Sequence, residues 1–492
     1  MKKIIASLLL TVLFYQAYAQ KGYEIKVKIN NLADSAIILG HHFAKSMYPD
    51  DTIKLDKNGA GVFKGKEPLP QGIYIVFLPN KSYFDLVVGE NQNFYVENDT
   101  SDLFKNIKFK NSADNQIFYD YQYFLGKKRD EVKKLHDSKK TPLSEADKKE
   151  LGEKMKVIDN EVKQYKDKLQ TDYPNSFVTK FIKATQDIEV PDAPRDAKGN
   201  ITDSSFQYHY YRTHYFDNFD LSDPRMLRTP LYEDKLMTYI DKVIPQTPDS
   251  INPEIDMLIA KSRTTPELFR YMLVSLFNHY VKSEIMGFDN VTFYIIEKYY
   301  LKEATWADTA SLNKMKKQVN EQKPTMIGKI APDIDLISVP LEHFLRGAED
   351  TAEKKNVYAG TPFKLSSYLK DYTILYFWDV DCGHCKKETP IMRDVYKRLK
   401  DKNVQLIAVS LVFNKENMEK WTNFVNENKL YDWVNAFYPY SIKYKELYNI
   451  VSTPSVFILD NTGKIIAKRI SAEQCEEIIN HEIEFKKRKT NK

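Results

Sequence analysis

The sequence predicts a multidomain chain with an antiparallel β-sandwich, an all-α domain and an α/β domain, in that order. Three observations support this order. Residues 21–105 alternate apolar and polar side chains with a period of two. Residues 112–322 contain long runs rich in Lys and Glu. An apolar run at residues 373–378 then precedes two cysteines at the expected start of a helix.

The first 19 residues have the features of a cleaved signal peptide. Lys2 and Lys3 form a basic segment, residues 4–14 are apolar, and Ala17-Tyr18-Ala19 is a small-residue cleavage site before Gln20. The apolar segment is too short to span a bilayer comfortably, and no later segment is long enough. We therefore expect cleavage near Ala19-Gln20, a periplasmic location and no membrane span in the mature chain.

Charge and cysteine content narrow the functional classes. The net charge of +5 falls to +3 when Lys2 and Lys3 are removed, which is too balanced to indicate nucleic-acid binding. The chain has 3 cysteines, and two of them form one motif. An exported chain of this kind is not held together by disulfides, so the motif is expected to have a chemical role.

Residues 21–105 are expected to form the β-sandwich. Tyr23, Ile25, Val27 and Ile29 lie on one face of the first strand. Through Asp51-Thr52 and the following run Asp56-Lys57-Asn58-Gly59, the segment resembles the N-terminal β-domain, of unassigned function, that precedes thioredoxin modules in some Gram-negative envelope proteins. The adjacent pair His41-His42 points to opposite faces of a strand, so it does not predict a metal site. Further strand-like runs are residues 36–39, 52–55, 61–63, 73–78, 84–88 and 93–96.

Residues 106–325 are expected to form the all-helical domain. An unusual aromatic segment, Phe206 to Phe219, has two interpretations: a surface for a sugar or peptide, or a helix packed against the β-domain or the C-terminal domain. We favour packing, because clustered aromatic residues are usually buried. His209 and His214 are five residues apart, which is poor spacing for a shared metal on one helix. Helices are predicted at residues 116–135, 145–169, 268–283, 291–303 and 311–321.

The motif Cys382-Gly383-His384-Cys385 predicts a dithiol redox couple. This spacing allows a Cys382–Cys385 disulfide. The free N–H groups and partial positive charge at a helix N-terminus favour a thiolate on Cys382. We therefore expect Cys382 to be the exposed attacking thiol and Cys385 to be the shielded one.

Two other uses of the cysteines fit less well. A zinc site needs further Cys or His ligands at suitable spacing, and the third cysteine, Cys475, is isolated. Peroxiredoxin nucleophiles follow Pro and Thr seven and three residues upstream, where this chain has Leu375 and Asp379. We expect neither a metal nor a cofactor, and we interpret Cys475 as a structural thiol.

The run F-W-D-V-D-C-G-H-C-K-K-E-T-P at residues 377–390 resembles the TlpA/ResA-type thioredoxin-like reductases. Residues 452–455 resemble the loop with the cis-proline of the thioredoxin fold, and residues 330–333 resemble the opening segment of redoxin domains. The resemblance covers about residues 326–485 and implies a thioredoxin fold over 326–492. Two residues depart from the thioredoxin pattern: Asp381 replaces a Trp, and Tyr376 replaces a buried Asp.

The resemblance implies a thiol–disulfide oxidoreductase, working as a reductase on protein or peptide disulfides and recharged by a dithiol donor that the sequence does not name. Glu388 matches the active-site glutamate of this subfamily and would exchange a proton with a thiol; the alternative is an exposed helical Glu. Substrate contacts are expected from five residues: Trp378, Gly383, His384, Thr453 and Pro454. Two other functions stay open: a ligand- or partner-binding protein with an accessory redox module, and a dithiol relay in c-type cytochrome maturation.

The remaining elements of the C-terminal domain follow from periodicity and turn signals. Ser471 to Gln474 resembles a capping box before a last helix. The expected elements are helix 382–399, strand 404–412, helix 415–428, a run at 433–437, helix 442–448, a hairpin of 455–459 with 465–469, and a helix ending near 486.

Overall fold

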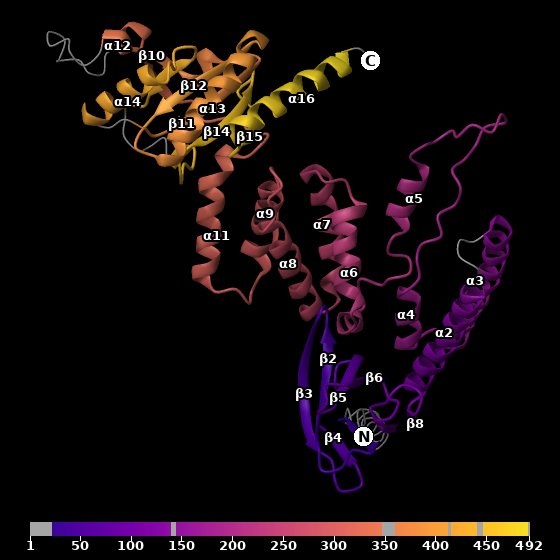
Figure 1. Cartoon of the computed structure of the whole chain (residues 1–492). Coiled ribbons are helices and arrows are strands. Elements are labelled where there is room, and N and C mark those ends of the chain that lie inside the picture. The colour runs from indigo at the N-terminus through magenta and orange to yellow at the C-terminus, as the bar shows by residue number, and fades with distance from the viewer. Residues whose placement is uncertain (1–21, 139–143, 347–359, 412–414, 440–445, 491–492) are drawn as a thin grey trace, which may run out of the picture. The chain divides into compact units, whose positions relative to one another are not determined.

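The computed structural model describes residues 22–138, 144–346, 360–411, 415–439 and 446–490 (Figure 1). The expected signal peptide lies outside these residues. The chain forms two compact units, Met1–Gln246 with Pro253–Met272, and Thr247–Asn252 with Leu273–Lys492. The N-terminal region is rich in strands, the middle is helical, and the C-terminal part has a thioredoxin-like α/β fold. Among the described helices, none has both the length and the apolar character to cross a membrane.

Two four-stranded sheets form the N-terminal region, with the strand orders β4-β1-β7-β8 and β3-β2-β5-β6. Their buried side chains join into one hydrophobic cluster. Ile25, Val27 and Ile29 are at most 1% exposed, which confirms the period-two pattern. The strands are β1 (Glu24–Asn30), β2 (Ala36–Phe43), β3 (Ser46–Lys54), β4 (Ala60–Lys64), β5 (Gly72–Phe77), β6 (Tyr83–Val88), β7 (Asn93–Asp99) and β8 (Lys108–Lys110).

The expectation of purely antiparallel sheets is wrong at one pair. β1 runs parallel to β7, with Glu24 opposite Asn93 and Asn30 opposite Asp99. The intervening strands β2 to β6 supply the long connection that parallel neighbours require. Alternation along each strand predicts which face is buried, but it carries no information on the direction of the neighbouring strand.

The predicted long helices are confirmed. α2 is Ala113–Asp137, and α3 begins after Ser144, whose side chain and that of Asp147 form a capping box. Buried Asn115 exchanges two hydrogen bonds with the backbone of Val87, at 2.7 and 2.8 Å, and so joins α2 to the edge strand β6. The other helices are α3 (Glu145–Asp172), α4 (Phe177–Ala184), α5 (Phe206–His214), α6 (Leu231–Thr238), α7 (Pro248–Lys261), α8 (Pro266–Val281), α9 (Asp289–Ile295), α10 (Leu301–Glu303) and α11 (Thr309–Gln322).

The aromatic segment packs on a neighbour that we did not expect. The helix α5 itself contains no buried residue, whereas Tyr215 and Phe219, just after it, are buried. The Tyr215 ring centroid lies 5.2 Å from that of Tyr239, and the Phe219 centroid lies 5.5 Å from that of Tyr232. These partners belong to the helical region, so the predicted packing against the β-domain or the C-terminal domain is wrong for these rings. Amphipathic spacing shows that a face is buried, but it does not identify the surface that covers it.

A seven-stranded sheet with the order β10-β9-β13-β12-β11-β14-β15 forms the centre of the C-terminal part. β11 pairs in parallel with β12 and antiparallel with β14. The predicted elements are confirmed within a few residues, except that residues 442–445 of one expected helix lie outside the described residues. The strands are β9 (Asp335–Ser338), β10 (Thr361–Lys364), β11 (Tyr372–Trp378), β12 (Val404–Ser410), β13 (Val434–Phe437), β14 (Ser455–Asp460) and β15 (Ile465–Lys468); the helices are α12 (Leu341–Arg346), α13 (Gly383–Leu399), α14 (Lys415–Glu427) and α16 (Ala472–Thr490).

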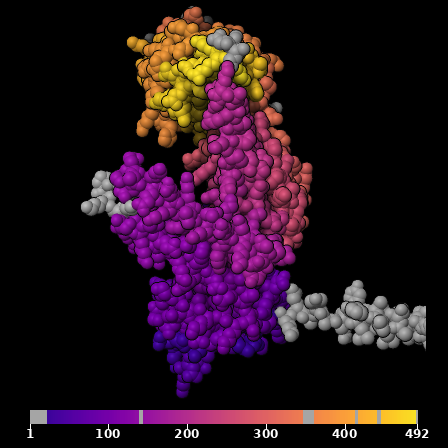
Figure 2. Space-filling view, turned by 90° about the vertical axis from the view of Figure 1, so that its right-hand side faces the viewer, coloured from indigo at the N-terminus to yellow at the C-terminus, as the bar shows by residue number. Residues whose placement is uncertain are grey.

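Alternate residues of β11 enter two different cores. Tyr376 and Trp378 join the cluster that also contains side chains of α13, α14 and α16, whereas Leu375 and Phe377 join the cluster on the opposite face of the sheet. Every residue of β11 is buried, as expected for a central strand covered on both faces. The last described helix, α16, yellow in Figure 2, lies on the surface of this unit.

The helices after residue 273 belong to the same compact unit as this sheet. The ammonium group of Lys468 on β15 forms an ion pair with the carboxylate of Asp289, the first residue of α9. The Lys468 side chain is only 7% exposed. In addition, the Gly328 N–H donates a hydrogen bond to the Ile465 carbonyl over 2.8 Å. The unit therefore extends N-terminally beyond the redox domain that the sequence predicts.

Candidate active site

Cys382 lies at the end of β11 and caps the next helix. α13 begins at Gly383, one residue later than expected, and Cys382 is its N-cap. The Cys382 sulfur accepts a hydrogen bond from the N–H of Cys385 over 3.5 Å. It therefore occupies the place that a Ser or Asp oxygen takes at other helix starts.

The surroundings of Cys382 favour its thiolate. Partial burial would raise the pKa of this thiol, but hydrogen bonds from the Thr453 side chain and from the Cys385 backbone outweigh burial and hold the pKa below its usual value. The sulfur is half-buried. Because the thiolate is the reactive form, Cys382 combines access with reactivity.

Cys385 has the opposite environment. Its side chain is fully buried, and this burial raises the pKa of the thiol to about 12. Its sulfur accepts a weak hydrogen bond from the backbone N–H of Asp379 at 3.5 Å. The expected order of exposure, with Cys382 accessible and Cys385 shielded, is confirmed.

The loop at residues 452–455 lies against the first cysteine. The Thr453–Pro454 peptide bond is cis, which agrees with the expectation from the resemblance. The Cys382 sulfur lies 3.3 Å from the Thr453 carbonyl oxygen, which accepts the S–H of the thiol form. Thr453 and Pro454 thus lie beside the reactive sulfur, although Thr453 is 71 residues from Cys382 in the sequence.

Two further predicted substrate contacts lie on the open side of the motif. Gly383 and His384 are both exposed, and a Cβ atom built on Gly383 would meet no atom within 4 Å. Their exposure leaves room for a second chain beside Cys382.

Trp378 cannot make the substrate contact that we expected. Its side chain is 0% exposed and packs in the core next to Phe424, with ring centroids 5.4 Å apart. Successive side chains of a strand point to opposite faces of the sheet. Trp378, two residues after Tyr376, therefore points to the same face as Tyr376, the face that α13, α14 and α16 cover. Trp378 therefore supports the site from the hydrophobic core.

Glu388 is half-buried on α13, one turn after Cys385. One of its carboxylate oxygens, Oε1, accepts a hydrogen bond from the backbone N–H of Ala472 over 2.6 Å, at the first residue of α16. Ser471 and Gln474 form the predicted capping box at the same helix start, with contacts of 2.9 and 3.4 Å.

The sequence did not identify two polar contacts around the motif. The Tyr376 hydroxyl forms a buried hydrogen bond of 2.9 Å with the Thr389 hydroxyl, and the signal for it was the Tyr at a position where thioredoxins carry Asp. The Asp381 carboxylate, next to Cys382, forms an ion pair with Lys420 at 3.2 Å and accepts a hydrogen bond from Asn417 at 3.0 Å. Both partners of Asp381 come from α14, and no local pattern in the sequence indicates this pairing.

Cys475 is separate from this chemistry. Its side chain is 0% exposed, and its thiol donates a hydrogen bond to the Ser471 carbonyl over 3.3 Å. Burial raises the pKa of this thiol to about 12. A buried neutral thiol on an amphipathic helix agrees with the structural role that we predicted.

Comparisons with known proteins match three segments of the chain. Residues 370–465 match the Thioredoxin-like family model. Residues 143–323 match a domain of unknown function, DUF5106, and residues 23–118 match another, DUF4369.

The similar curated proteins are bacterial thiol–disulfide oxidoreductases. The sporulation thiol–disulfide oxidoreductase A of Bacillus subtilis is 34% identical over 112 residues, which is 21% of this chain and 64% of that protein. The thiol–disulfide oxidoreductase ResA of Bacillus anthracis is 32% identical over 122 residues, which is 24% of this chain and 65% of that protein. The chain therefore spans slightly less than two thirds of the length of these relatives.

Solved structures include StoA from Bacillus subtilis, at 24% identity and a TM-score of 0.23 over 29% of this chain and 94% of that one. A thioredoxin-like protein from Bacteroides caccae covers 60% of this chain and 98% of that one, at 15% identity and a TM-score of 0.40. Because both TM-scores are below 0.5, the assignment depends on the family model and the curated relatives. The C-terminal part of the chain therefore matches the Thioredoxin-like family model and is similar to the bacterial thiol–disulfide oxidoreductases of the ResA type.

Proposed function

We propose that this protein is a thiol–disulfide oxidoreductase that reduces disulfides of protein or peptide substrates through Cys382 and Cys385. One observation carries the proposal. The half-buried Cys382 sulfur has a lowered pKa and lies 3.3 Å from the Thr453 carbonyl, while the fully buried Cys385 has a pKa raised to about 12. The two thiols therefore have the different reactivities that a two-step exchange needs.

In the first step, the Cys382 thiolate attacks one sulfur of the substrate disulfide. A bond forms between the Cys382 sulfur and that atom, and the second substrate sulfur leaves as a thiolate. The exposed residues Gly383 and His384, with Thr453 and Pro454, form the surface that would receive the substrate.

In the second step, Cys385 loses its proton and attacks the Cys382 sulfur of the mixed disulfide. The first substrate sulfur then leaves, and Cys382 and Cys385 become the oxidised pair. Two electrons have passed to the substrate, and a dithiol donor must return two electrons to the couple. We propose Glu388 as the group that exchanges the proton of a thiol, and its place one turn after Cys385 supports this role.

We also propose a periplasmic location, on the basis of the basic and apolar segments and the small-residue site at residues 2–19. The three family-model matches support a division into a β-rich domain, a helical domain and the redox domain.

Trapping of mixed disulfides tests the proposal. A Cys385→Ser variant of the full chain cannot complete the second step, so it should accumulate covalent adducts that a reductant releases. A Cys382→Ser variant should form none, and a Cys475→Ser variant should behave as the parent does. Equal trapping by Cys382→Ser and Cys385→Ser would refute the assignment of roles.

The identity of the trapped proteins separates the narrower functions. A range of unrelated exported proteins would indicate general disulfide reduction. Adducts confined to apocytochromes c would indicate a dithiol relay in cytochrome maturation.

A further inference from the structure

A cavity of about 520 Å³ lies in the helical region of the N-terminal compact unit. Its walls come from the ends of α3 and α7, from α4, from the segment after α5 and from the short 3-10 helix η1 (Pro224–Arg228). It lies wholly within the segment that matches the domain of unknown function DUF5106. The lining does not include any residue of the cysteine motif, so its role is independent of the proposed function.

The walls of the cavity are largely apolar. Side chains of Phe216, Phe219, Leu221, Met226 and Met257 line it. Two aromatic rings and two flexible methionine side chains can adapt to an apolar group of varied shape.

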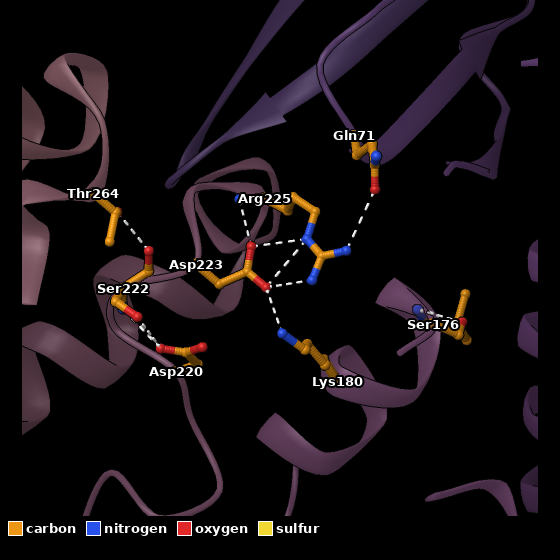
Figure 3. A network of polar contacts seen from close by, with 9 residues as sticks. Gln71, Ser176, Lys180, Asp220, Ser222, Asp223, Arg225 and Thr264 are labelled. Carbon is orange, nitrogen blue, oxygen red and sulfur yellow. Dashed lines mark hydrogen bonds and ion pairs between the residues drawn. The ribbon is translucent and has the colours of Figure 1, made fainter. Parts of the chain in front are cut away.

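The lysines at the cavity differ in whether an acidic side chain pairs with them. Lys180 is held by the buried Asp223, at 3.2 Å, and Asp223 is also bound by Arg225 (Figure 3). Lys183 and Lys261 also line the cavity, and within the described part of the chain no acidic partner is seen for either.

The acidic residues of the lining are already engaged. Asp217 forms an ion pair with His214 at 2.7 Å. Asp220 accepts hydrogen bonds from the backbone and hydroxyl of Ser222, as Figure 3 shows. The three lysines and Arg225 stand against three aspartates, the two of the lining and Asp223, so four positive charges minus three negative charges leave a surplus of one. This surplus suits a ligand with a single negative charge better than a doubly charged phosphate.

A buried polar atom is a second, independent indication of a ligand. The Thr179 hydroxyl belongs to a residue of the cavity wall that is only 3% exposed, and its oxygen has no hydrogen-bond partner among the residues that the structure describes. A buried hydroxyl without a hydrogen-bond partner is destabilising, so such groups usually have a partner. An oxygen-bearing ligand in the cavity would supply the missing partner.

We propose that this cavity binds a carboxylate with an apolar body. Lys183 and Lys261 face the carboxylate, the Thr179 hydroxyl donates a hydrogen bond to the ligand, and the apolar body packs on Phe216 and Phe219. This chemistry has two sources, a free organic acid and the C-terminus of a peptide that ends in an apolar residue.

Calorimetric titration of the full-length chain with matched probes tests the proposal. The probes are 3-phenylpropanoate and its neutral amide, and acetyl-Ala-Phe with either a free or an amidated C-terminus. We expect saturable binding of at least one carboxylate, and binding about 10-fold weaker for the matching amide, since two partly exposed ion pairs are lost. The carboxylate that binds tighter identifies the source.

Variants assign the binding to this cavity. Lys183→Met with Lys261→Met should weaken binding of the carboxylate about 10-fold and leave the amide unchanged. Thr179→Val, which keeps the side-chain shape, should also weaken the carboxylate. A matched control, Lys314→Met with Lys316→Met on α11, removes the same charge elsewhere and should change nothing. Absence of saturable binding by both carboxylates, equal binding of acid and amide, or equal effects of the two double variants would each overturn the proposal.

Discussion

The Glu388 carboxylate accepts a hydrogen bond from the Ala472 backbone N–H over 2.6 Å and thereby joins α13, the helix of the two cysteines, to the start of α16. The N–H groups in the first turn of a helix have no partner within that helix. A carboxylate at that place satisfies one of them and interacts favourably with the helix dipole. Glu388 therefore has an anchoring contact in addition to the proton-exchange role that we propose.

The two roles of Glu388 predict different effects for two substitutions of this residue. Glu388→Gln keeps an oxygen for the Ala472 N–H but cannot exchange a proton, so we expect near-parental stability and disulfide exchange slowed by about 10²-fold, with an altered pH profile. Glu388→Ala loses the hydrogen bond as well and should be less stable by about 1 kcal/mol. Insulin-reduction kinetics and urea unfolding measure both effects. A Gln variant with the parent's rate and pH profile would leave Glu388 with the anchoring role alone.

The unequal burial of the three cysteines predicts their order of alkylation. In the reduced chain, iodoacetamide should modify Cys382 first, while Cys385 and Cys475, whose pKa values are raised to about 12 by burial, stay unmodified at neutral pH. The Cys382 rate should fall as the pH is lowered through its depressed pKa, because its thiolate is lost there. Peptide mass mapping measures each site, and preferential labelling of Cys385 would contradict the assigned roles.

The same surroundings predict the redox potential of the couple. A stabilised Cys382 thiolate stabilises the reduced form and raises the potential, while nearby carboxylates oppose this effect. We expect a value between those of thioredoxin and protein disulfide isomerase, about −270 to −180 mV. A glutathione titration of the full chain gives the value. A potential near that of DsbA, about −120 mV, would make the protein an oxidant.

Lys420 is expected to tune this potential through Asp381, with which it forms an ion pair of 3.2 Å. Lys420→Met would leave the Asp381 charge unpaired next to Cys382, so the pKa of Cys382 should rise and the couple should become slightly more reducing. Asp381→Asn should shift both quantities in the opposite direction. Both shifts should shrink in about 1 M salt, because these side chains are exposed and screened. Shifts of the same sign in the two variants would rule out this electrostatic explanation.

The ion pair of Lys468 with Asp289 predicts the stability of the C-terminal unit. Asp289→Asn leaves the buried Lys468 charge without its partner and should cost about 3–5 kcal/mol of unfolding free energy. Glu321→Gln, which breaks the exposed pair with Lys317, is the control and should cost at most about 1 kcal/mol.

Tryptophan fluorescence during urea unfolding isolates the effect of these substitutions. All 4 tryptophans, Trp306, Trp378, Trp421 and Trp433, lie in the unit that contains Leu273–Lys492. Equal losses of unfolding free energy in the Asp289 and Glu321 variants would show that the burial of Lys468 does not make its ion pair more costly to break than an exposed one.

The local elements of this protein follow from short patterns in its amino-acid sequence. The apolar run before Cys382, the two-residue spacing to Cys385 and the capping box at Ser471 are patterns within a few residues, so a strand, a helix start and a dithiol couple could be predicted without the fold. Period-two alternation also identified the buried face of β1. These signals can be recognised in the sequence because side-chain periodicity and helix caps depend on local backbone geometry.

The contacts between residues that are far apart in the sequence became known from the three-dimensional fold. Glu388 is bound to a residue 84 positions away and Asp381 to one 39 positions away, and β1 lies parallel to β7 instead of antiparallel to all its neighbours. Trp378, which its place beside the motif suggested as a substrate contact, is buried because β11 is a central strand covered on both faces. Such pairings arise from the packing of whole elements, and many partners of similar chemistry compete for each side chain, so no local pattern in the sequence specifies them.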